Sequence, residues 1–431
     1  MKRFLLPIVA GVFILVAIPA FILMRDMFVD PLKVSTSSAP TEMAGEASRG
    51  SYLARAGNCM ACHTVRGGMA YAGGRAISTP YGDIYTSNIT PDPETGIGTW
   101  SSDDFWRALH HGKSKSGRLL YPAFPYTNYT NVTRADSDAL FAYLKTIPPV
   151  RQENRTHALR FPYNQPIVLA AWRGLYFRPG EYVPADHQNA QWNRGAYLVK
   201  GLGHCSACHT ARNALGASST KNDLAGGMMP VSNWYASALT SSGEEGLGDW
   251  RVKDVRDFLH TGVSARGAAF GPMAGVVSTS LQHLSGDDIE AMAIYLKSIA
   301  PGTMPVARSA PTERSPEATA VLEDGGRLYE RHCAECHLAN GKGAGIAYPP
   351  LAGSSTLHAP SPVNAIRIVL NGGFAPVTHG NPRPYGMPPF GTTLSDYEIA
   401  AVVSYIRTSW GNDSPMVTPI DVMRFRGIPA D

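Results

Sequence analysis

The sequence predicts an all-α protein of three similar domains in tandem behind one N-terminal transmembrane helix. The first observation is a pentapeptide, Cys-x-x-Cys-His, that occurs three times and begins at Cys59, Cys205 and Cys333. The second is that a helical pattern precedes each copy and another follows it at a distance. The third is an uncharged, mostly apolar run that extends from Phe4 to Met24.

Length and composition limit the organisation and the partners. A chain of 431 residues is long enough for two to four domains, at roughly 100–200 residues each. A net charge of +4 without a basic tract argues against a nucleic-acid partner. The predicted division is an anchor or signal sequence over 1–33, a first domain over 45–150, a linker over 151–188, a second domain over 189–301, a linker over 302–318, a third domain over 319–411, and a tail over 412–431 that is expected to lie across another domain or a partner.

The apolar run from 4 to 24 is long enough to cross a bilayer, which takes about 20 residues. A cleaved secretory signal usually has only about 7–15 apolar residues. Lys2 and Arg3 precede the run, and this charge predicts that the N-terminus lies inside and the rest of the chain outside the cytoplasm. The alternative is a long signal peptide that is removed.

Each pentapeptide has the form of an attachment site for c-type haem, in which two thiols bind the porphyrin and the adjacent histidine binds the iron. The alternatives are a zinc knuckle, a thioredoxin-like dithiol or chance. A structural zinc site would pair two motifs at short separation, whereas these copies lie more than a hundred residues apart and use all six cysteines. The sequence therefore predicts three covalently bound haem c groups, attached outside the cytoplasm through the pairs Cys59 and Cys62, Cys205 and Cys208, and Cys333 and Cys336, with proximal ligands His63, His209 and His337.

The helical patterns around each motif also repeat. The segments that begin at Arg49, Arg194 and Gly326 place a glycine near an aromatic residue, which suggests close helix packing. The segments 138–147, 288–299 and 398–409 are amphipathic. Crossing the two helices over the haem edge would bury both apolar faces, and this arrangement resembles class I cytochrome c domains. A middle helix, 103–112 in the first domain and 253–262 in the second, makes these two domains more alike.

A haem that only transfers electrons usually has a second axial ligand from a loop before the last helix, and methionine there raises its potential. Met273 and Met387 lie in such loops and are the predicted distal ligands. The matching position in the first domain is Phe124, which cannot bind iron. Four options stay open for that haem: His110, His111, Met69, or an open sixth site. His110 has a counterpart in His260, which favours a structural role.

Together with the repeat around them, these motifs give the chain from residue 49 to the tail a resemblance to a known family. It resembles the three-haem cytochrome c subunit of bacterial membrane-bound, quinone-reducing dehydrogenases for alcohols, aldehydes, gluconate or fructose. The segments that carry the resemblance are Thr86–Asp92, Tyr121–Tyr126, Gly201–Cys205, Thr210–Asn213 and Gly386–Phe390. It implies an electron-transfer and membrane-anchoring subunit on the periplasmic side of the cytoplasmic membrane. Such a subunit passes electrons from a catalytic subunit to ubiquinone and has no substrate chemistry of its own.

Phe124 and the retained anchor are departures from many members of that family. The segment Ala123–Tyr126 looks more like cytochromes paired with molybdenum hydroxylases, including aldehyde dehydrogenases. The favoured partner is therefore a molybdopterin subunit with a small iron–sulfur subunit, and a quinoprotein or flavoprotein stays open. Two other hypotheses are a free-standing or oxidase-linked membrane cytochrome, and a haem enzyme with an open first haem.

Overall fold

The computed structural model describes residues 40–229, 231–241, 245–301 and 315–428. The predicted anchor over 1–33 lies outside these residues. Among the helices that are described, none is long and apolar enough to cross a membrane. The chain divides into two compact units. One contains the residues up to Val183 together with Lys200–His204, and the other contains Pro184–Val199 and everything from Cys205 onward.

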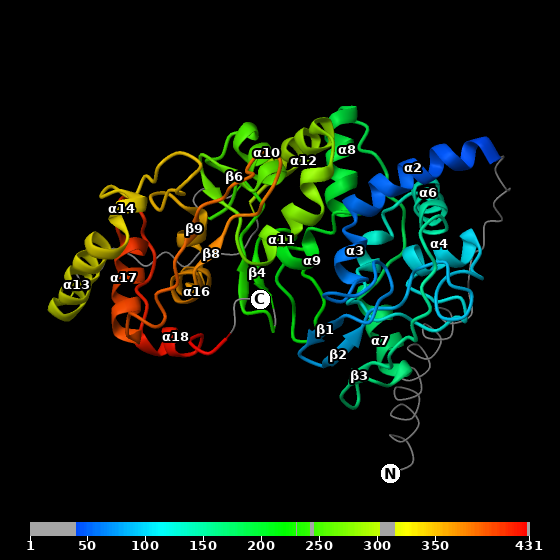
Figure 1. Cartoon of the computed structure of the whole chain (residues 1–431), viewed down its shortest axis with the longest axis horizontal. Coiled ribbons are helices and arrows are strands. Elements are labelled where there is room, and N and C mark those ends of the chain that lie inside the picture. The colour runs from blue at the N-terminus through cyan, green and yellow to red at the C-terminus, as the bar shows by residue number, and fades with distance from the viewer. Residues whose placement is uncertain (1–39, 230, 242–244, 302–314, 429–431) are drawn as a thin grey trace, which may run out of the picture. The chain divides into compact units, whose positions relative to one another are not determined.

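The first unit holds the first module, which is mostly helical with one small sheet (Figure 1). Its strands β1, β2 and β3 pair antiparallel in that order. Its elements are α2 (Pro40–Ala56), α3 (Cys59–Cys62), β1 (Ala76–Thr79), β2 (Gly82–Tyr85), α4 (Ser102–His111), α5 (Tyr126–Tyr129), α6 (Arg134–Leu144), β3 (Ala158–Leu159) and α7 (Pro166–Tyr176).

In this unit α2 already begins at Pro40, before the predicted start of the first domain at 45. The predicted linker is also ordered. The linker over 151–188 contributes β3 to the sheet and contains α7, where Leu169 and Ala170 form a buried cluster with Leu119. Most of this linker is therefore part of the first unit rather than a free connection.

The second unit holds the second and third modules. Its strands form three antiparallel pairs, β4 with β5, β6 with β7, and β8 with β9. The second module consists of α8 (Ala190–Lys200), α9 (Ser206–His209), β4 (Gly227–Met229), β5 (Trp234–Ala236), α10 (Val252–Thr261), β6 (Val263–Ser264), β7 (Gly267–Ala268), α11 (Pro272–Thr279), the 3-10 turn η1 (Leu281–His283) and α12 (Gly286–Ser298). The third consists of α13 (Pro316–His332), α14 (Ala334–His337), α15 (Ser355–His358), α16 (Val363–Asn371), β8 (Gly373–Phe374), β9 (Gly386–Met387), α17 (Asp396–Thr408) and α18 (Pro419–Met423). The all-α prediction is thus confirmed as a mostly helical fold, to which short hairpins are added.

The first and last helices of each module cross at a glycine, as predicted. A Cβ atom added there would lie 1.9 Å, 1.9 Å and 2.2 Å from a backbone carbonyl oxygen of the last helix, so no other residue fits. The glycine and carbonyl partners are Gly50 with Ala139, Gly195 with Ala291, and Gly325 with Ala401. In the third module the contact was expected at Gly326, but it is made by Gly325.

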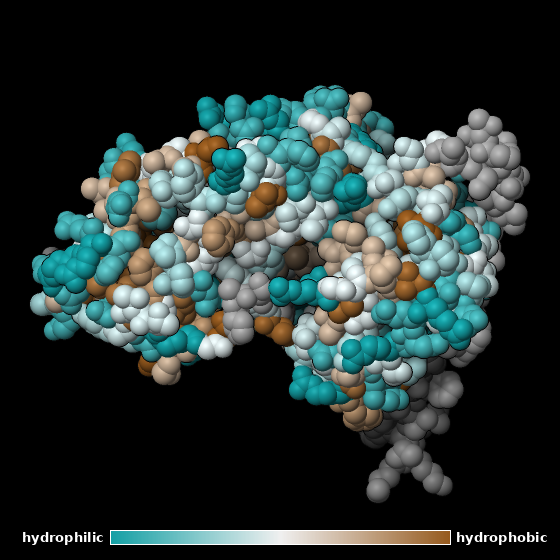
Figure 2. All heavy atoms as spheres, viewed as in Figure 1, coloured by the Kyte–Doolittle hydropathy of each residue, from teal (hydrophilic) through white to brown (hydrophobic). Residues whose placement is uncertain are grey.

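The helix α17 is the centre of the third module. It starts with a capping box of Ser395 and Glu398, and its apolar face is buried against α13 and α16. The surface over α13 is mainly hydrophilic in Figure 2, as expected for an amphipathic helix with its apolar face turned inward. The tail was expected to lie across another module or a partner. Instead, Val417 and Val422 belong to the core of the third module itself.

Candidate haem sites

Each Cys-x-x-Cys-His motif lies on a short helical turn that follows the first helix of its module. The histidine ring is oriented by a backbone carbonyl from a later loop. The Nδ1 atom lies 2.7 Å from the Ser87 oxygen for His63, 2.7 Å from the Ser237 oxygen for His209, and 2.9 Å from the Pro349 oxygen for His337. A carbonyl only accepts, so Nδ1 carries the proton and Nε2 keeps its lone pair for a metal.

Burial shifts the pKa values of the histidines and of the first cysteines of the motifs. Burial lowers the pKa of His63, His209 and His337, which keeps the rings neutral, as metal ligation requires. Burial also raises the pKa of Cys59 and Cys205 to about 12. Redox-active thiols need the opposite shift. Within the described parts of the chain, no group of three His, Cys, Asp or Glu side chains could hold a metal ion.

Aromatic side chains surround the cysteines and make the surroundings suitable for a porphyrin. In the third module Tyr329 and Tyr405 lie with their ring centroids 4.9 Å and 5.5 Å from that of Trp410. In the first module Tyr71 contacts Tyr143 edge to face at 6.2 Å, within the same cluster as Cys59. Paired thiols, one oriented imidazole and an aromatic lining are the donor set and surroundings that haem c requires.

The two predicted distal methionines lie at defined places in the second unit. Met273 is the second residue of α11 and follows Gly271, which caps the helix at φ 54°. Met387 lies in β9, and its carbonyl lies so close to Gly372 that an added Cβ would approach it to 2.4 Å. Both thioethers are partly buried. Their role as ligands stays a prediction.

The first module has no thioether in the matching loop. Phe124 lies in a turn with its ring 5.3 Å from that of Tyr129. Met69 is 61% exposed in the loop that follows the motif. Its role, like those of the histidines and of an open site, stays a prediction.

The two histidines at the end of α4 are held in different ways. The His110 ring is buried, stacks on Trp106 at 4.2 Å and donates to the Thr130 carbonyl. The carbonyl of His111 accepts from the Arg173 guanidinium at 2.8 Å.

Two further residues, both within the segments that carry the family resemblance, lie near the motifs. His204 directly precedes Cys205 and has a left-handed backbone at φ 36°. Its ring hydrogen-bonds to the Gly57 backbone and lies 5.6 Å from Tyr129. Asn88 is buried and donates to the Val150 carbonyl at 2.7 Å, next to the carbonyl that orients His63. Both contacts join distant parts of the chain, so the sequence pattern indicated the residues but not these partners.

Comparison with known proteins identifies the family of this chain. The cytochrome c family matches residues 47–148 and 322–410. The chain is 42% identical over 394 residues to the gluconate 2-dehydrogenase cytochrome c subunit of Pantoea cypripedii, a match that covers 88% of this chain and 89% of that protein. It belongs to the family of dehydrogenase cytochrome c subunits. Another member, the alcohol dehydrogenase (quinone) cytochrome c subunit of Gluconacetobacter polyoxogenes, is 38% identical over 92% of this chain and 87% of its own length.

A third relative is much longer than this chain. The chain is 44% identical to a nicotinate dehydrogenase component of Pseudomonas putida over 85% of this chain, but the match spans only 30% of that protein. This chain is therefore a cytochrome c electron-transfer subunit of a dehydrogenase complex, with haem c attached through its cysteine pairs.

Proposed function

We propose that this chain carries electrons through three haems, from the catalytic subunit of a periplasmic dehydrogenase to ubiquinone in the cytoplasmic membrane. The observation that supports this most is the repeated geometry of the three motifs. In each, the histidine Nδ1 binds a carbonyl at 2.7–2.9 Å, so that Nε2 is presented in the same way beside the paired cysteines.

The protein attaches each haem, orients the ligands of its iron and sets its reduction potential. When bound, each haem supplies one-electron redox chemistry at its iron. The cysteine pairs fix the porphyrin, and the three carbonyl-bound imidazoles fix the proximal side. Met273 and Met387 would complete the distal side, raise the potential and exclude substrates from the iron. A chain with this task performs no substrate chemistry of its own.

The substrate is chosen by another polypeptide. The relatives are named as parts of gluconate, alcohol, fructose and nicotinate dehydrogenases, so one kind of cytochrome serves several substrates. We favour an aldehyde- or alcohol-oxidising partner, with molybdopterin and a small iron–sulfur subunit, because of the form of Ala123–Tyr126. A quinoprotein or flavoprotein partner is the alternative. The name alcohol dehydrogenase (quinone) supports a quinone as the acceptor.

The test is mild detergent extraction of the native complex, followed by mass spectrometry of every subunit and a quinone-reduction assay. We expect this chain to carry the mass of three haems, to retain residues 1–33 and to copurify with a large catalytic subunit. A molybdopterin subunit would support the favoured partner, and a quinoprotein or flavoprotein would replace it. Recovery alone or with terminal oxidase subunits would favour a free-standing or oxidase-linked cytochrome.

A second candidate function rests on Phe124. If no other side chain binds the first iron, this haem has an open site and could act on a small ligand such as a peroxide. Carbon monoxide binding to one reduced haem of three, measured by difference spectroscopy, would support this function. Six-coordinate spectra for all three haems would exclude it.

A further inference from the structure

The helix α16 of the third module makes a two-point contact with strand β5 of the second. The Asn364 side-chain oxygen accepts from the Tyr235 amide at 2.9 Å, and its amide nitrogen donates to the Tyr235 carbonyl at 2.8 Å. Strand β5 pairs with β4 in a sheet of two strands. Asn364 therefore takes the place of a neighbouring strand and satisfies the backbone groups on the other edge.

One turn further along α16, Arg367 reaches the turn that leads into β5. Its side chain is completely buried, donates to the Ser232 carbonyl at 2.5 Å, and lies 4.4 Å from the ring centroid of Trp234. Arginine stays charged, so burying it is costly unless it is well bonded and stacked. The buried guanidinium is stabilised by the carbonyls and by the face of the aromatic ring. These contacts fix the path of the chain before β5.

Strand β5 in turn contacts both segments that would bind the second haem iron, the one with His209 and the one with Met273. At its end, the Ser237 carbonyl accepts from Nδ1 of the proximal ligand His209 at 2.7 Å. At its start, the Trp234 ring packs so closely on Gly271 that an added Cβ would lie 2.8 Å from it. Gly271 caps α11, on which Met273 lies two residues later. A shift of β5 would therefore move the proximal and the distal ligand together.

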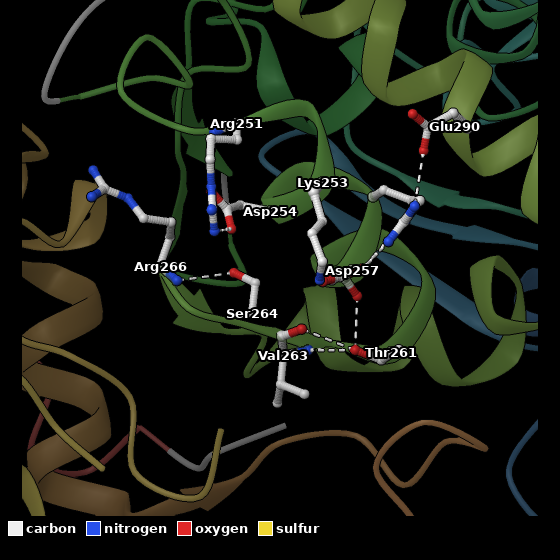
Figure 3. A network of polar contacts seen from close by, with 10 residues as sticks. Arg251, Lys253, Asp254, Asp257, Thr261, Val263, Ser264, Arg266 and Glu290 are labelled. Carbon is white, nitrogen blue, oxygen red and sulfur yellow. Dashed lines mark hydrogen bonds and ion pairs between the residues drawn. The ribbon is translucent and has the colours of Figure 1, made fainter. Parts of the chain in front are cut away.

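A second contact holds the two modules together at the end of α10. The Thr378 hydroxyl donates to the Thr261 carbonyl at 2.8 Å. Thr261 is itself fixed, because its hydroxyl donates to the Asp257 carbonyl at 2.7 Å, as Figure 3 shows. The carbonyl that receives Thr378 thus lies at the end of α10, and the hydrogen bond joins the segment between β8 and β9 to the second module.

We propose that α16 of the third module is a positioning element for the second haem, with Arg367 and Asn364 as its positioning residues. This positioning role rests on the proposed function, since it requires that His209 and Met273 bind the iron. Through β5, these residues hold the imidazole and the thioether on the axis of the second haem. The reduction potential of that haem then depends on a different module from the one that binds it.

The test uses the purified three-haem protein with Arg367→Lys, which keeps the charge but loses the planar fork. The potentials are measured by spectroelectrochemical titration, and Met273→Ala and Met387→Ala assign the second and third haems. We expect the second haem alone to fall in potential and to lose its methionine-ligation signal in the near-infrared spectrum. A tenfold loss in preference for ferrous iron corresponds to about 59 mV.

The matched control is Arg407→Lys. Arg407 is also completely buried on the third module, but it bonds carbonyls of its own module, those of Ala359 and Pro415. We expect this change to affect the third haem and leave the second unchanged. If Arg367→Lys does not fold, Asn364→Ala tests the same contact. A shift confined to the third haem, or no shift, would overturn the positioning role, whereas a protein without three haems would overturn the proposed function.

Discussion

A single carbonyl group determines which nitrogen each proximal histidine can offer to iron. The carbonyls of Ser87, Ser237 and Pro349 each accept from Nδ1, so the proton is fixed on that atom. Ser87 and Ser237 lie in a shared pattern, Tyr-x-Ser-x-x-Thr, at 85–90 and 235–240, whereas Pro349 lies in a different loop. The acceptor is a backbone carbonyl in all three modules, so the placement of the backbone decides the orientation of each ring.

The clearest prediction at this scale concerns Phe124→Met. A methionine here would match the positions of Met273 and Met387 and could give the first iron a thioether ligand. We expect the potential of the first haem to rise, because thioether ligation raises it, and carbon monoxide binding to be suppressed. Phe124→Leu is the control, since leucine cannot bind iron. Identical potentials and carbon monoxide binding in the two variants would show that residue 124 does not face the iron.

The buried histidine at the end of α4 predicts a pH dependence of stability. Burial and the nearby charge of His111 lower the pKa of His110 from 6.5 to about 4. The folded state thus keeps His110 neutral, so its protonation favours the unfolded chain. Stability is unaffected above pH 6.5 and is lost as the pH falls from 6.5 towards 4, by about 3 kcal/mol at 1.36 kcal/mol per pKa unit.

The measurement is denaturant unfolding of the wild type and of His110→Gln, which cannot be protonated, at pH 7 and pH 4. We expect the free energy of unfolding to fall more steeply with acid in the wild type than in the variant. Parallel losses in the two proteins would mean that His110 is not neutral in the folded state.

At the scale of the elements, each module depends on one crossing of two helices. The crossing is close because a glycine replaces a side chain at the point of contact, at residues 50, 195 and 325. The atoms opposite each glycine belong to the backbone, which cannot move aside as a flexible side chain can. The distance between the two helices therefore leaves no room for a side chain at the crossing.

Gly195→Ala tests this contact. The new Cβ would lie 1.9 Å from the Ala291 carbonyl oxygen, which forces the helices apart. We expect a loss of about 3 kcal/mol in the free energy of unfolding, at the upper end of overpacking effects. The control is Gly275→Ala on α11, where nothing lies within 4 Å of the added Cβ. We expect that change to stabilise by about 0.5–1 kcal/mol through helix propensity. Equal effects of the two changes would contradict the close crossing.

At the scale of the whole molecule, the second and third modules form one compact unit. We expect them to unfold in a single calorimetric transition, because the buried Arg367 and Asn364 bond the backbone of the second module. The double change Asn364→Leu with Arg367→Met should divide this transition into two. Arg407→Lys should lower the transition temperature without dividing it. A wild-type protein in which these modules already unfold separately would contradict the coupling.

Much of this protein could be predicted from local patterns. The three motifs, the helices on either side of them and the capping box at Ser395 follow from residue spacing within a few turns, because those interactions are local in the chain. The cysteine pairs that attach haem c follow from the same spacing. The order in the 151–188 linker and the packing of the tail do not, since they depend on burial against other elements of the first unit and of the third module.

The sequence by itself determined what this protein binds, because a thioether pair and its histidine lie within five residues and need no tertiary contact to be recognised. Tertiary structure alone decided how those groups are oriented. Ser87, Ser237 and Pro349 lie 24, 28 and 12 residues from the histidines they orient, and Asn364 lies 129 residues from Tyr235. Backbone carbonyls are the same in every residue type, so only folding determines which carbonyl each imidazole meets.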